Sequence, residues 1–513
     1  MIGYVFIIQS TLINALPTHY NVVRSFEDYV NSLRDGRIIY YRGKPVDDVT
    51  RHEILRAAIN HAAELYRWQA DPELRRFLTF DDPQYGTISR FYKAPRGPGD
   101  LIERFRLIYN TTLLGRGMFN IMKTIGSDAL FGLMIASRQL DRARGTNYYD
   151  RVMRYYERVV KDDVTIAVAQ TDVKGDRMLR PHQQEDPDVY VHIVGREPDG
   201  IIVKGAKVHT TQSIAANELI VLPYRNMIKE DTDYAVAFAL PVNTKGITLI
   251  PRPLREVEIN MLGDEFPMGR TNVEVETLTV FDNVKVPSDR VFLAGEYDFA
   301  ASYGLTFALF HRFTAISYRA ALADIVLGYA KLFAEYNDVE GASHIRRDIV
   351  DIITYKEYLV SSAIASAERC IRDPNAGICI PNPIYTNVGK LTANAKYLDA
   401  IKDMIDVAGG LLADIPSTSE LNNPTEEKYL VKYLVGKRGT DPRVRIRLFQ
   451  IAREFLSALG ALLSVGMIHA EGSIEASVIE LFRSYNYDIS RTAALYNADL
   501  AKMDDVKKLL EWW

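Results

Sequence analysis

The residues best suited to chemistry gather in one short stretch near the middle of the chain. Between Thr171 and Arg177 the sequence holds a hydroxyl, two cations, two carboxylates and a glycine. Cations and turn N–H groups of this kind bind phosphates and other anions. A plain turn between two strands would use the same residue types without any ligand. The stretch therefore predicts either an anion-binding loop or a simple turn.

His311 is the second candidate for chemistry. It stands in a predicted long helix, where Ala315 and Tyr318 fall on the same side because they follow at helical spacing. Imidazole titrates near neutral pH, so His311 suits a general base or a hydrogen-bond donor. The alternative is a buried histidine bonded to a backbone carbonyl. Both interpretations stay open at this point.

Cysteine is almost absent from the chain. Only Cys370 and Cys379 occur, and they stand close together in the sequence. Two thiols supply neither a disulfide framework nor a thiolate-rich metal site. We therefore expect reduced thiols and no iron–sulfur cluster.

Composition narrows the class of protein. The chain has 513 residues and a formal net charge of -4, without the basic excess that binds nucleic acid. No apolar run reaches the roughly 20 residues of a membrane span. Residues 1–24 form a predicted N-terminal extension; no Lys or Arg precedes Arg24, whereas a secretory signal begins with positive charge. We expect a cytoplasmic enzyme that acts on a small molecule and partners neither membrane nor nucleic acid.

Three segments must position these residues. Residues 25–160 show helical periodicity, residues 161–295 alternate in the manner of strands, and residues 296–513 return to long helical patterns. Long helices with short connections favour an antiparallel bundle. The predicted strands are 189–194, 201–204, 219–222 and 234–240, and the predicted helices are 51–68, 126–140, 305–337, 345–369, 391–408 and 444–469.

Several motifs follow one another in a fixed order. The stretch from Thr171 to Arg177 is followed by His209 to Thr211, by Phe281 to Pro287 and by His311 with Arg312. In this order they resemble the flavin-binding family of 4-hydroxyphenylacetate 3-hydroxylases and 4-hydroxybutyryl-CoA dehydratases, and the dehydratase branch most closely. The resemblance implies an α+β, acyl-CoA dehydrogenase-like fold. Such a fold has an N-terminal helical domain, a middle β-barrel domain and a C-terminal four-helix bundle, with the flavin between the last two.

The resemblance also implies a cofactor and an assembly. FAD would be bound, as FADH2 during turnover, and the absence of a Rossmann glycine fingerprint agrees with this family. Family members assemble through their bundles, which implies a homotetramer. The implied cofactor-binding residues are Ala169, Thr171, Lys174, Gly175, Asp176, Arg177, Thr211, Gly472 and Ser473.

The chain departs from the dehydratase branch at its iron–sulfur cluster. Three cysteines and one histidine hold that cluster, and the matching positions here are Asn120, Thr124 and Tyr318, with only His311 retained. Amide, hydroxyl and phenol oxygens do not replace thiolates in such a cluster. We expect no cluster and no other metal site, with Tyr318 filling the vacated volume.

The dehydratase's substrate side is also altered. Its tyrosine and lysine match Ala315 and Arg319, and a glutamate matches Gly466. Arg319 keeps the positive charge, but the other changes remove functional groups. Ordinary 4-hydroxybutyryl-CoA dehydration is therefore disfavoured, and Ala315 and Arg319 remain candidate substrate-binding residues.

The hydroxylase branch matches in part. Arg104 corresponds to its phenol-binding arginine, whereas Ile108 and Val168 replace its tyrosine and histidine. Tyr109 is adjacent, but a shift of one residue turns a helical side chain by about 100°. Arg104 is a candidate catalytic and substrate-binding residue beside His311, Tyr109 is a candidate substrate contact, and 4-hydroxyphenylacetate itself is placed in doubt.

Three functions follow from these patterns. The first is a reduced-flavin and O2-dependent hydroxylase of an aromatic or related small substrate, supplied with FADH2 by a separate flavin reductase because nothing resembles an NAD(P)H site. The second is a cluster-free isomerase or dehydratase acting on a CoA thioester. The third is a catalytically silent subunit that partners an active dehydratase.

Overall fold

A helical unit forms the first part of the structure. The computed structural model describes residues 23–254, 273–456 and 470–507. Local sequence explains where several helices begin: Ser25 and Asp71 cap α1 and α3 with their side-chain oxygens, and prolines open α3 and α4. The helices are α1 (Phe26–Ser32), α2 (Arg56–Ala70), α3 (Pro72–Leu78), α4 (Pro98–Leu114), α5 (Thr124–Arg144) and α6 (Tyr148–Asp162). The predicted helices 51–68 and 126–140 are confirmed as α2 and α5.

Two packed sheets follow the helical unit. One is six-stranded, in the order β2-β1-β10-β11-β7-β6, and the other is four-stranded, in the order β12-β9-β8-β5. The rings of Phe238 and Phe281 meet edge to face between them. The strands are β1 (Ile38–Tyr41), β2 (Lys44–Pro45), β5 (Ile166–Ala169), β6 (His192–Glu197), β7 (Gly200–Thr211), β8 (Glu218–Val221), β9 (Val236–Pro241), β10 (Ile247–Pro251), β11 (Glu276–Pro287) and β12 (Val291–Ala294).

The six-stranded sheet contains a strand that the periodicity did not indicate. β1 comes from the segment before α2, yet it pairs in parallel with β10, with Ile38 opposite Thr248. The four predicted strands are confirmed as β6, β7, β8 and β9.

Gly200 stands where β7 begins beside β11. A Cβ there would lie 2.1 Å from the carbonyl oxygen of Val286. Close approach to β11 therefore requires the glycine.

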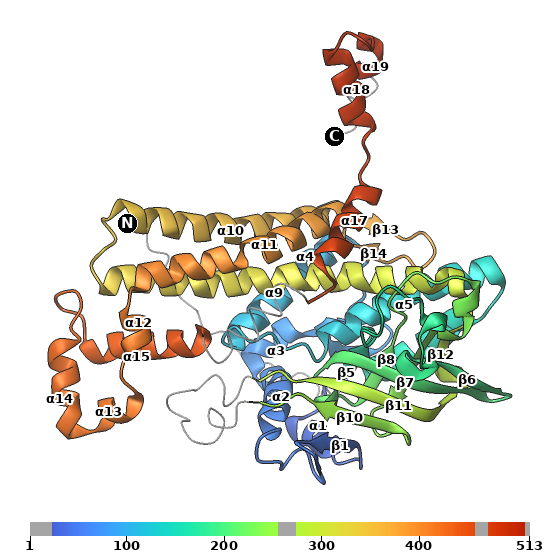
Figure 1. The fold of residues 1–513 in the computed structure, drawn as a ribbon, viewed down its shortest axis with the longest axis horizontal. Coiled ribbons are helices and arrows are strands. Elements are labelled where there is room, and N and C mark those ends of the chain that lie inside the picture. The colour runs from blue at the N-terminus through green and yellow to red at the C-terminus, as the bar shows by residue number, and fades with distance from the viewer. Residues whose placement is uncertain (1–22, 255–272, 457–469, 508–513) are drawn as a thin grey trace, which may run out of the picture.

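Long helices lie side by side above the sheets (Figure 1). They are α9 (Ala300–Tyr336), α10 (Ser343–Glu368) and α11 (Pro383–Ala408). A small hairpin of β13 (Ile371–Arg372) and β14 (Cys379–Ile380) joins the last two, and both cysteines are free thiols. The three predicted helices of this region are confirmed.

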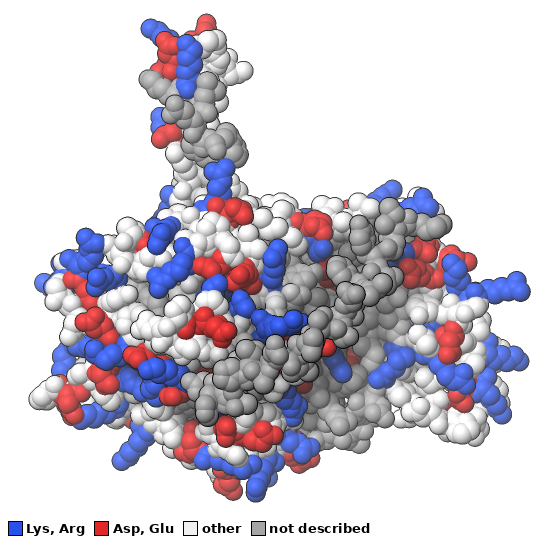
Figure 2. Space-filling view, turned by 180° about the vertical axis from the view of Figure 1, so that it is seen from behind, with Lys and Arg blue, Asp and Glu red and all other residues white. Residues whose placement is uncertain are grey.

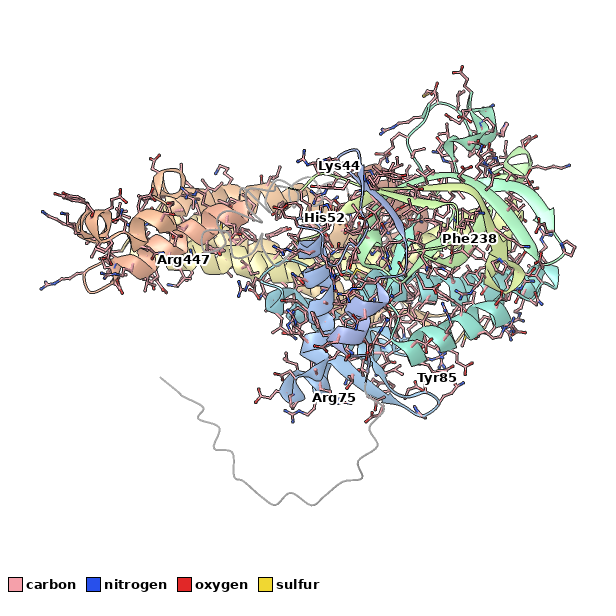
Figure 3. The ribbon with its side chains drawn as sticks, turned by 90° about the horizontal axis from the view of Figure 1, so that it is seen from below. Lys44, His52, Arg75, Tyr85, Phe238 and Arg447 are labelled. Carbon is pink, nitrogen blue, oxygen red and sulfur yellow. The ribbon has the colours of Figure 1, made fainter. Side chains whose placement is uncertain are left out.

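Shorter helices complete the C-terminal part. They are α12 (Leu411–Asp414), α13 (Thr418–Asn422), α14 (Pro424–Tyr433), α15 (Pro442–Glu454), α17 (Ile474–Ser484), α18 (Asp488–Asn497) and α19 (Met503–Lys507). The α12–α15 group, marked by Arg447, extends away from the sheets, marked by Phe238 (Figure 3). The predicted helix 444–469 is confirmed within α15, and its last thirteen residues, 457–469, lie outside the described part.

α4 packs against α9 and α10 of the bundle, and α5 packs against α9 on the side of the sheets (Figure 1). On the surface, positive and negative side chains are interspersed over the face seen in Figure 2.

Among the described residues, no helix has the length and apolar character needed to cross a membrane.

A glycine contact between α5 and α9 yields a stability prediction. A Cβ at Gly132 would lie 2.8 Å from the backbone nitrogen of Phe307, and backbone cannot move aside as a side chain can. Gly132→Ala should therefore lower the free energy of unfolding by about 1–3 kcal/mol. Thermal unfolding monitored by circular dichroism measures the change.

The matched control lies on α9 itself. Nothing approaches within 4 Å of a Cβ placed at exposed Gly328. Gly328→Ala should raise the free energy of unfolding by up to about 1 kcal/mol, because alanine favours a helix. Equal effects of the two substitutions would contradict the packing of α5 against α9.

Candidate functional site

The predicted anion-binding loop follows β5 and is held by its neighbours. The Gln184 amide accepts from the Asp176 N–H at 3.0 Å and donates to the Asp176 carbonyl at 2.9 Å. The Tyr190 hydroxyl donates to the Lys174 carbonyl at 3.1 Å. Gly175 adopts a φ of +52°, and a Cβ there would meet the same glutamine and tyrosine. These contacts fix the backbone while the side chains of residues 174–177 stay exposed.

Two cations and two carboxylates stand on this loop, and one of the carboxylates, Asp172, is paired with Lys207 at 2.6 Å. Burial lowers the pKa of Lys174, and the nearby charges of Arg177 and Arg225 lower it further. Burial also lowers the pKa of His209, with Lys174 contributing. The Lys174 amine makes no hydrogen bond within the described residues. Cations that repel one another beside a braced loop suit a polyanion such as a pyrophosphate.

The loop stands where the sheets meet the bundle. The Gln170 side-chain amide, at the end of β5, donates to the Gly304 carbonyl of α9 at 3.4 Å. Thr171 accepts from the Val208 N–H on β7 at 2.9 Å, and Thr211 lies further along that strand. Ala169 is buried in β5 and offers only its backbone.

Gly472 and Ser473 lie at a different border of the bundle. Gly472 has a φ of +92°, and a Cβ there would lie 3.4 Å from an Arg312 nitrogen. The Ser473 hydroxyl caps α17 by accepting from the Ala476 N–H at 3.2 Å. Their described contacts are therefore with α9 and α17.

Asp128 on α5 organises the interior beside this junction. Its side chain is fully buried. One oxygen accepts from Arg104 at 2.6 Å and from the Thr314 hydroxyl at 3.1 Å, and the other lies 3.1 Å from His311 Nδ1. Sequence reasoning missed Asp128, although a lone carboxylate in the apolar run of α5 is a usable signal.

His311 is oriented by that carboxylate. Because an ionised carboxylate only accepts, Nδ1 carries the proton and Nε2 is left as the acceptor. Nε2 makes no hydrogen bond with the described residues, and the ring stacks on Phe307 at 5.2 Å between centroids. The hydrogen-bond partner of His311 is thus a carboxylate, whereas the purely structural interpretation of the sequence had predicted a backbone carbonyl. Such a histidine is equipped to take or give a proton at Nε2.

Arg104 is buried, and both terminal nitrogens of its guanidinium donate hydrogen bonds, whereas its Nε has no acceptor among the described residues. Besides Asp128, it donates to the Phe91 carbonyl at 3.1 Å and to the Ser127 hydroxyl at 2.9 Å. Ile108 is buried on the same helix, whereas Tyr109 is half-buried with its ring packed on Phe105. The described contacts thus connect Arg104 to His311 through Asp128 and place Tyr109 on another side of α4.

The positions of the relatives' cluster ligands are filled by packed side chains. The Tyr318 ring stacks on Phe119, with centroids 4.6 Å apart. The Asn120 amide donates to the His61 carbonyl at 2.7 Å, and the Thr124 hydroxyl to the Asn120 carbonyl at 3.4 Å. These residues do not fit an iron–sulfur cluster, because they bring no thiolate and their polar atoms are engaged elsewhere.

A second buried carboxylate, Glu471, faces α9 from the turn before α17. It accepts from the Tyr318 hydroxyl at 2.7 Å and from Arg319 at 2.7 Å, and Lys390 on α11 lies 3.7 Å away. Asn394 accepts from Arg319 at 2.5 Å and from Lys390 at 3.1 Å. Sequence reasoning singled out Arg319 and missed its partners, since nothing in their spacing links them.

Lys390 is buried, and burial is unfavourable for a charged amine. Its side chain is 1% exposed. Burial lowers its pKa to about 7, and the charges of Arg319 and Arg312 act in the same direction against Glu471. The amine is therefore poised to exchange a proton near neutral pH.

Ala315 lies one turn before Arg319 and is fully buried on α9. Gly466, matched to the dehydratase glutamate, lies outside the described residues.

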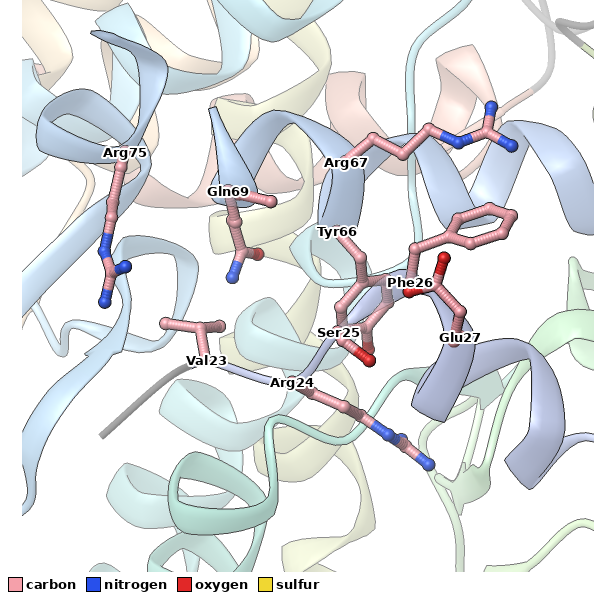
Figure 4. Close-up of a pocket in the computed structure, with 10 residues that line it drawn as sticks. Val23, Arg24, Ser25, Phe26, Glu27, Tyr66, Arg67, Gln69 and Arg75 are labelled. Atoms are coloured by element: carbon pink, nitrogen blue, oxygen red, sulfur yellow. The ribbon is translucent and has the colours of Figure 1, made fainter. Parts of the chain in front are cut away.

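A separate cavity of about 400 Å³ opens between the start of α1 and the C-terminal end of α2 (Figure 4). Tyr66, Gln69 and Arg24 are among its described lining residues, and none of the predicted site residues is. This cavity is distinct from the junction described above.

A helical unit, a β unit and a bundle in this order define a protein of the acyl-CoA dehydrogenase-like class. The sequence matches the N-terminal part of the 4-hydroxyphenylacetate 3-hydroxylase family over residues 26–293 and its C-terminal part over residues 301–498. The chain therefore belongs to the 4-hydroxyphenylacetate 3-hydroxylase family, among whose relatives are both oxygenases and dehydratases.

Individual relatives are of both kinds. A 4-hydroxybutyryl-CoA dehydratase/vinylacetyl-CoA-Δ-isomerase of Clostridium aminobutyricum is 30% identical over 91% of this chain and 98% of its own length. The oxygenase component of 4-hydroxyphenylacetate 3-monooxygenase of Thermus thermophilus is 26% identical over 86% and 90%. An oxygen-tolerant archaeal 4-hydroxybutyryl-CoA dehydratase from N. maritimus superposes with a TM-score of 0.86, at 27% identity over 94% and 96%.

The lowered pKa of Lys390 makes a prediction for stability against pH. Between pH about 7 and 10.5 the unfolded amine holds a proton that the folded one has lost. Unfolding then takes up a proton, so the free energy of unfolding rises with pH across this window, by up to about 1.4 kcal/mol per pH unit. Lys390→Met removes this rise, which thermal unfolding at a series of pH values measures.

Lys402→Met on the same helix is the control, because that side chain is 74% exposed and should leave the slope unchanged. Buried Lys123, with a pKa lowered to about 8 by burial, contributes equally in all three proteins. Identical slopes in the wild type and in Lys390→Met would show that Lys390 stays protonated when folded.

Proposed function

We propose that the protein binds FAD and uses reduced flavin with O2 to hydroxylate an aromatic or related small molecule. The observation that carries the proposal is the braced, cationic loop of residues 171–177 at the junction of sheets and bundle, with the Asp128-held His311 on the neighbouring helix. Oxygenase components among the relatives act on phenols by their names. A reduced flavin would supply the activation of O2.

Each part of the loop has a proposed role towards the cofactor. Lys174 and Arg177 neutralise the pyrophosphate, while Gly175 presents a backbone N–H group and Thr171 a hydroxyl. Asp176 borders the cofactor, and its own N–H is bonded to Gln184. Ala169 and Thr211 border the loop on β5 and β7. Gly472 and Ser473 approach the cofactor from the turn before α17. The exposed cations and the fixed backbone support this assignment.

His311 is proposed to move a proton at Nε2 during the reaction. Arg104 acts through Asp128, because its guanidinium holds the carboxylate that orients the imidazole. Ala315, Arg319 and Tyr109 are proposed to border the substrate. The pocket works without an iron–sulfur cluster, since the matched positions carry oxygen and amide groups.

A separate flavin reductase is the proposed source of reduced flavin. The proposed location of the protein is the cytoplasm. The proposed assembly is a homotetramer. The outer faces of α10 and α11 support it, because they expose apolar side chains at Val350, Ile353, Tyr358, Leu398 and Ile405. Light scattering of the purified protein measures the assembly.

The second candidate function is isomerisation or cluster-free dehydration of a CoA thioester. It is favoured by the 30% identity to a dehydratase/isomerase across nearly the full length of both chains. A change in the flavin spectrum on adding crotonyl-CoA or vinylacetyl-CoA would favour this function over hydroxylation. If neither redox state of flavin binds, the silent-subunit hypothesis is the one left.

The cationic loop predicts how flavin affinity responds to mutation. Lys174→Ala should weaken FAD binding roughly tenfold, because a charge-assisted contact contributes about 1.5–3 kcal/mol. Fluorescence titration with oxidised and reduced flavin measures it. Lys204→Ala, which removes an exposed cation of β7 paired with Asp188, serves as the control and should bind flavin normally.

His311 predicts a separable effect on turnover. His311→Asn keeps a donor towards Asp128 but loses the titrating Nε2, so turnover should fall by about 10²–10⁴-fold with flavin affinity retained. The assay is NADH-driven O2 uptake and product formation with an added flavin reductase and a panel of phenols. Full turnover by this variant would confine His311 to a structural role.

A further inference from the structure

The buried cluster around Glu471 holds three basic side chains but only two carboxylates. Arg319 is paired with Glu471, and Arg312 is paired with Glu480 of α17 and bonded to Asn387. Lys390 remains, sharing Glu471 at a distance beyond a hydrogen bond. An unneutralised charge in such a place is costly, so the site favours either a neutral amine or an added anion.

Several donors of this cluster are unfilled. Within the described residues, the Lys390 amine donates one hydrogen bond, to Asn394 at 3.1 Å, whereas an ammonium has three N–H groups. The buried Arg319 Nε has no acceptor among the same residues. Donors left open on two facing helices are suited to an anionic ligand that is not part of the protein.

The cluster also lies where a substrate is proposed to bind. Lys390 and Arg319 share Asn394, and Ala315 stands one turn away on α9. α11 approaches α9 closely here, because a Cβ at Gly389 would lie 3.2 Å from the Ile316 side chain. The amine of Lys390 thus faces the same stretch of α9 as the proposed substrate contacts.

We propose that Lys390 accepts the acidic proton of a phenolic substrate and then holds the resulting anion together with Arg319. This inference rests on the proposed function and deepens it. The O–H bond of the phenol breaks, its electron pair stays on the oxygen, and the proton forms a new N–H bond on Lys390 Nζ. The phenolate ring is richer in electrons than the phenol and more readily attacked by an electrophilic oxygen donor.

The charged and titratable groups that face Lys390 are consistent with this role. Burial and two guanidinium groups lower the pKa of the amine, so that it is largely neutral and able to accept a proton just above neutral pH. Because the phenol brings its own proton, transfer of that proton to the amine leaves the net charge of the cluster unchanged. Arg319, Arg312 and Glu471 act on the amine directly. The groups that surround these three are His311 and Tyr318 beside Glu471, Tyr355 beside Arg319, and Glu480 paired with Arg312.

Direct observation of the bound phenol tests the inference. The probe is phenol labelled at its hydroxyl-bearing carbon, added to the FAD-loaded full chain at about pH 8, where free phenol, with a pKa near 10, is neutral. The chemical shift of the labelled carbon reports its ionisation. The wild type should show the phenolate shift without net release of a proton to the buffer.

Two variants separate proton transfer from charge. Lys390→Met should bind the probe as neutral phenol and about tenfold more weakly, because a charged hydrogen bond is lost. Lys390→Arg keeps the charge but cannot accept a proton, so it should bind phenolate and release one proton per probe molecule to the buffer. Calorimetry in buffers of different ionisation enthalpy counts that proton.

The outcomes distinguish this inference from the proposed function. A neutral phenol bound to the wild type, a Lys390→Met variant with an unchanged shift, or flavin binding without binding of the probe would each overturn the role of Lys390 and leave the flavin function intact. If flavin does not bind in either redox state, the proposed function itself fails, and this inference fails with it. The wild-type measurement decides the matter even if a variant does not fold.

Discussion

The carboxylate of Asp128 is the contact on which the arrangement of the site depends. It joins α4, α5 and α9, because Arg104, Thr314 and His311 all bond to it from different helices. A buried carboxylate without these partners would cost several kcal/mol, so the helices pack stably only with these partners in place. The orientation of the imidazole is therefore fixed by helix packing, and a helix holds a side chain more rigidly than a loop does.

Glu471 plays a corresponding part further along α9. It binds Tyr318 and Arg319, and so connects the turn of Gly472 and Ser473 to the interior of the bundle. Both carboxylates bond to side chains on the same stretch of α9, between His311 and Arg319. In that stretch the Tyr318 ring stacks on Phe119. Packing and ion pairs therefore hold this part of the described structure together.

Much of the architecture could be predicted from the sequence, because long helices and alternating strands carry a periodic signal. Strand β1 could not, since its place is decided by Thr248 and Leu249, which are distant in the sequence. The loop from Thr171 to Arg177 was found from its residue types. Asp128 and Lys390 were missed because each is a single charge within a helix, and its partners come from other elements with no spacing relation to it. The sequence around Gly200 does not show that β11 approaches it, and the sequence around Lys390 does not show which charged groups surround its amine.

The pairing of β1 with β10 has a consequence for how this chain can be divided. A module that contained only the sheets would leave the backbone groups of β10 without a neighbour on that side, and an unpaired sheet edge invites aggregation. A chimera that exchanges the central unit between relatives would have to carry the ribbon of β1 and β2 with it. The change from helical to alternating periodicity in the sequence therefore does not mark the edge of a structural unit. The unit that could be exchanged between relatives also includes β1 and β2.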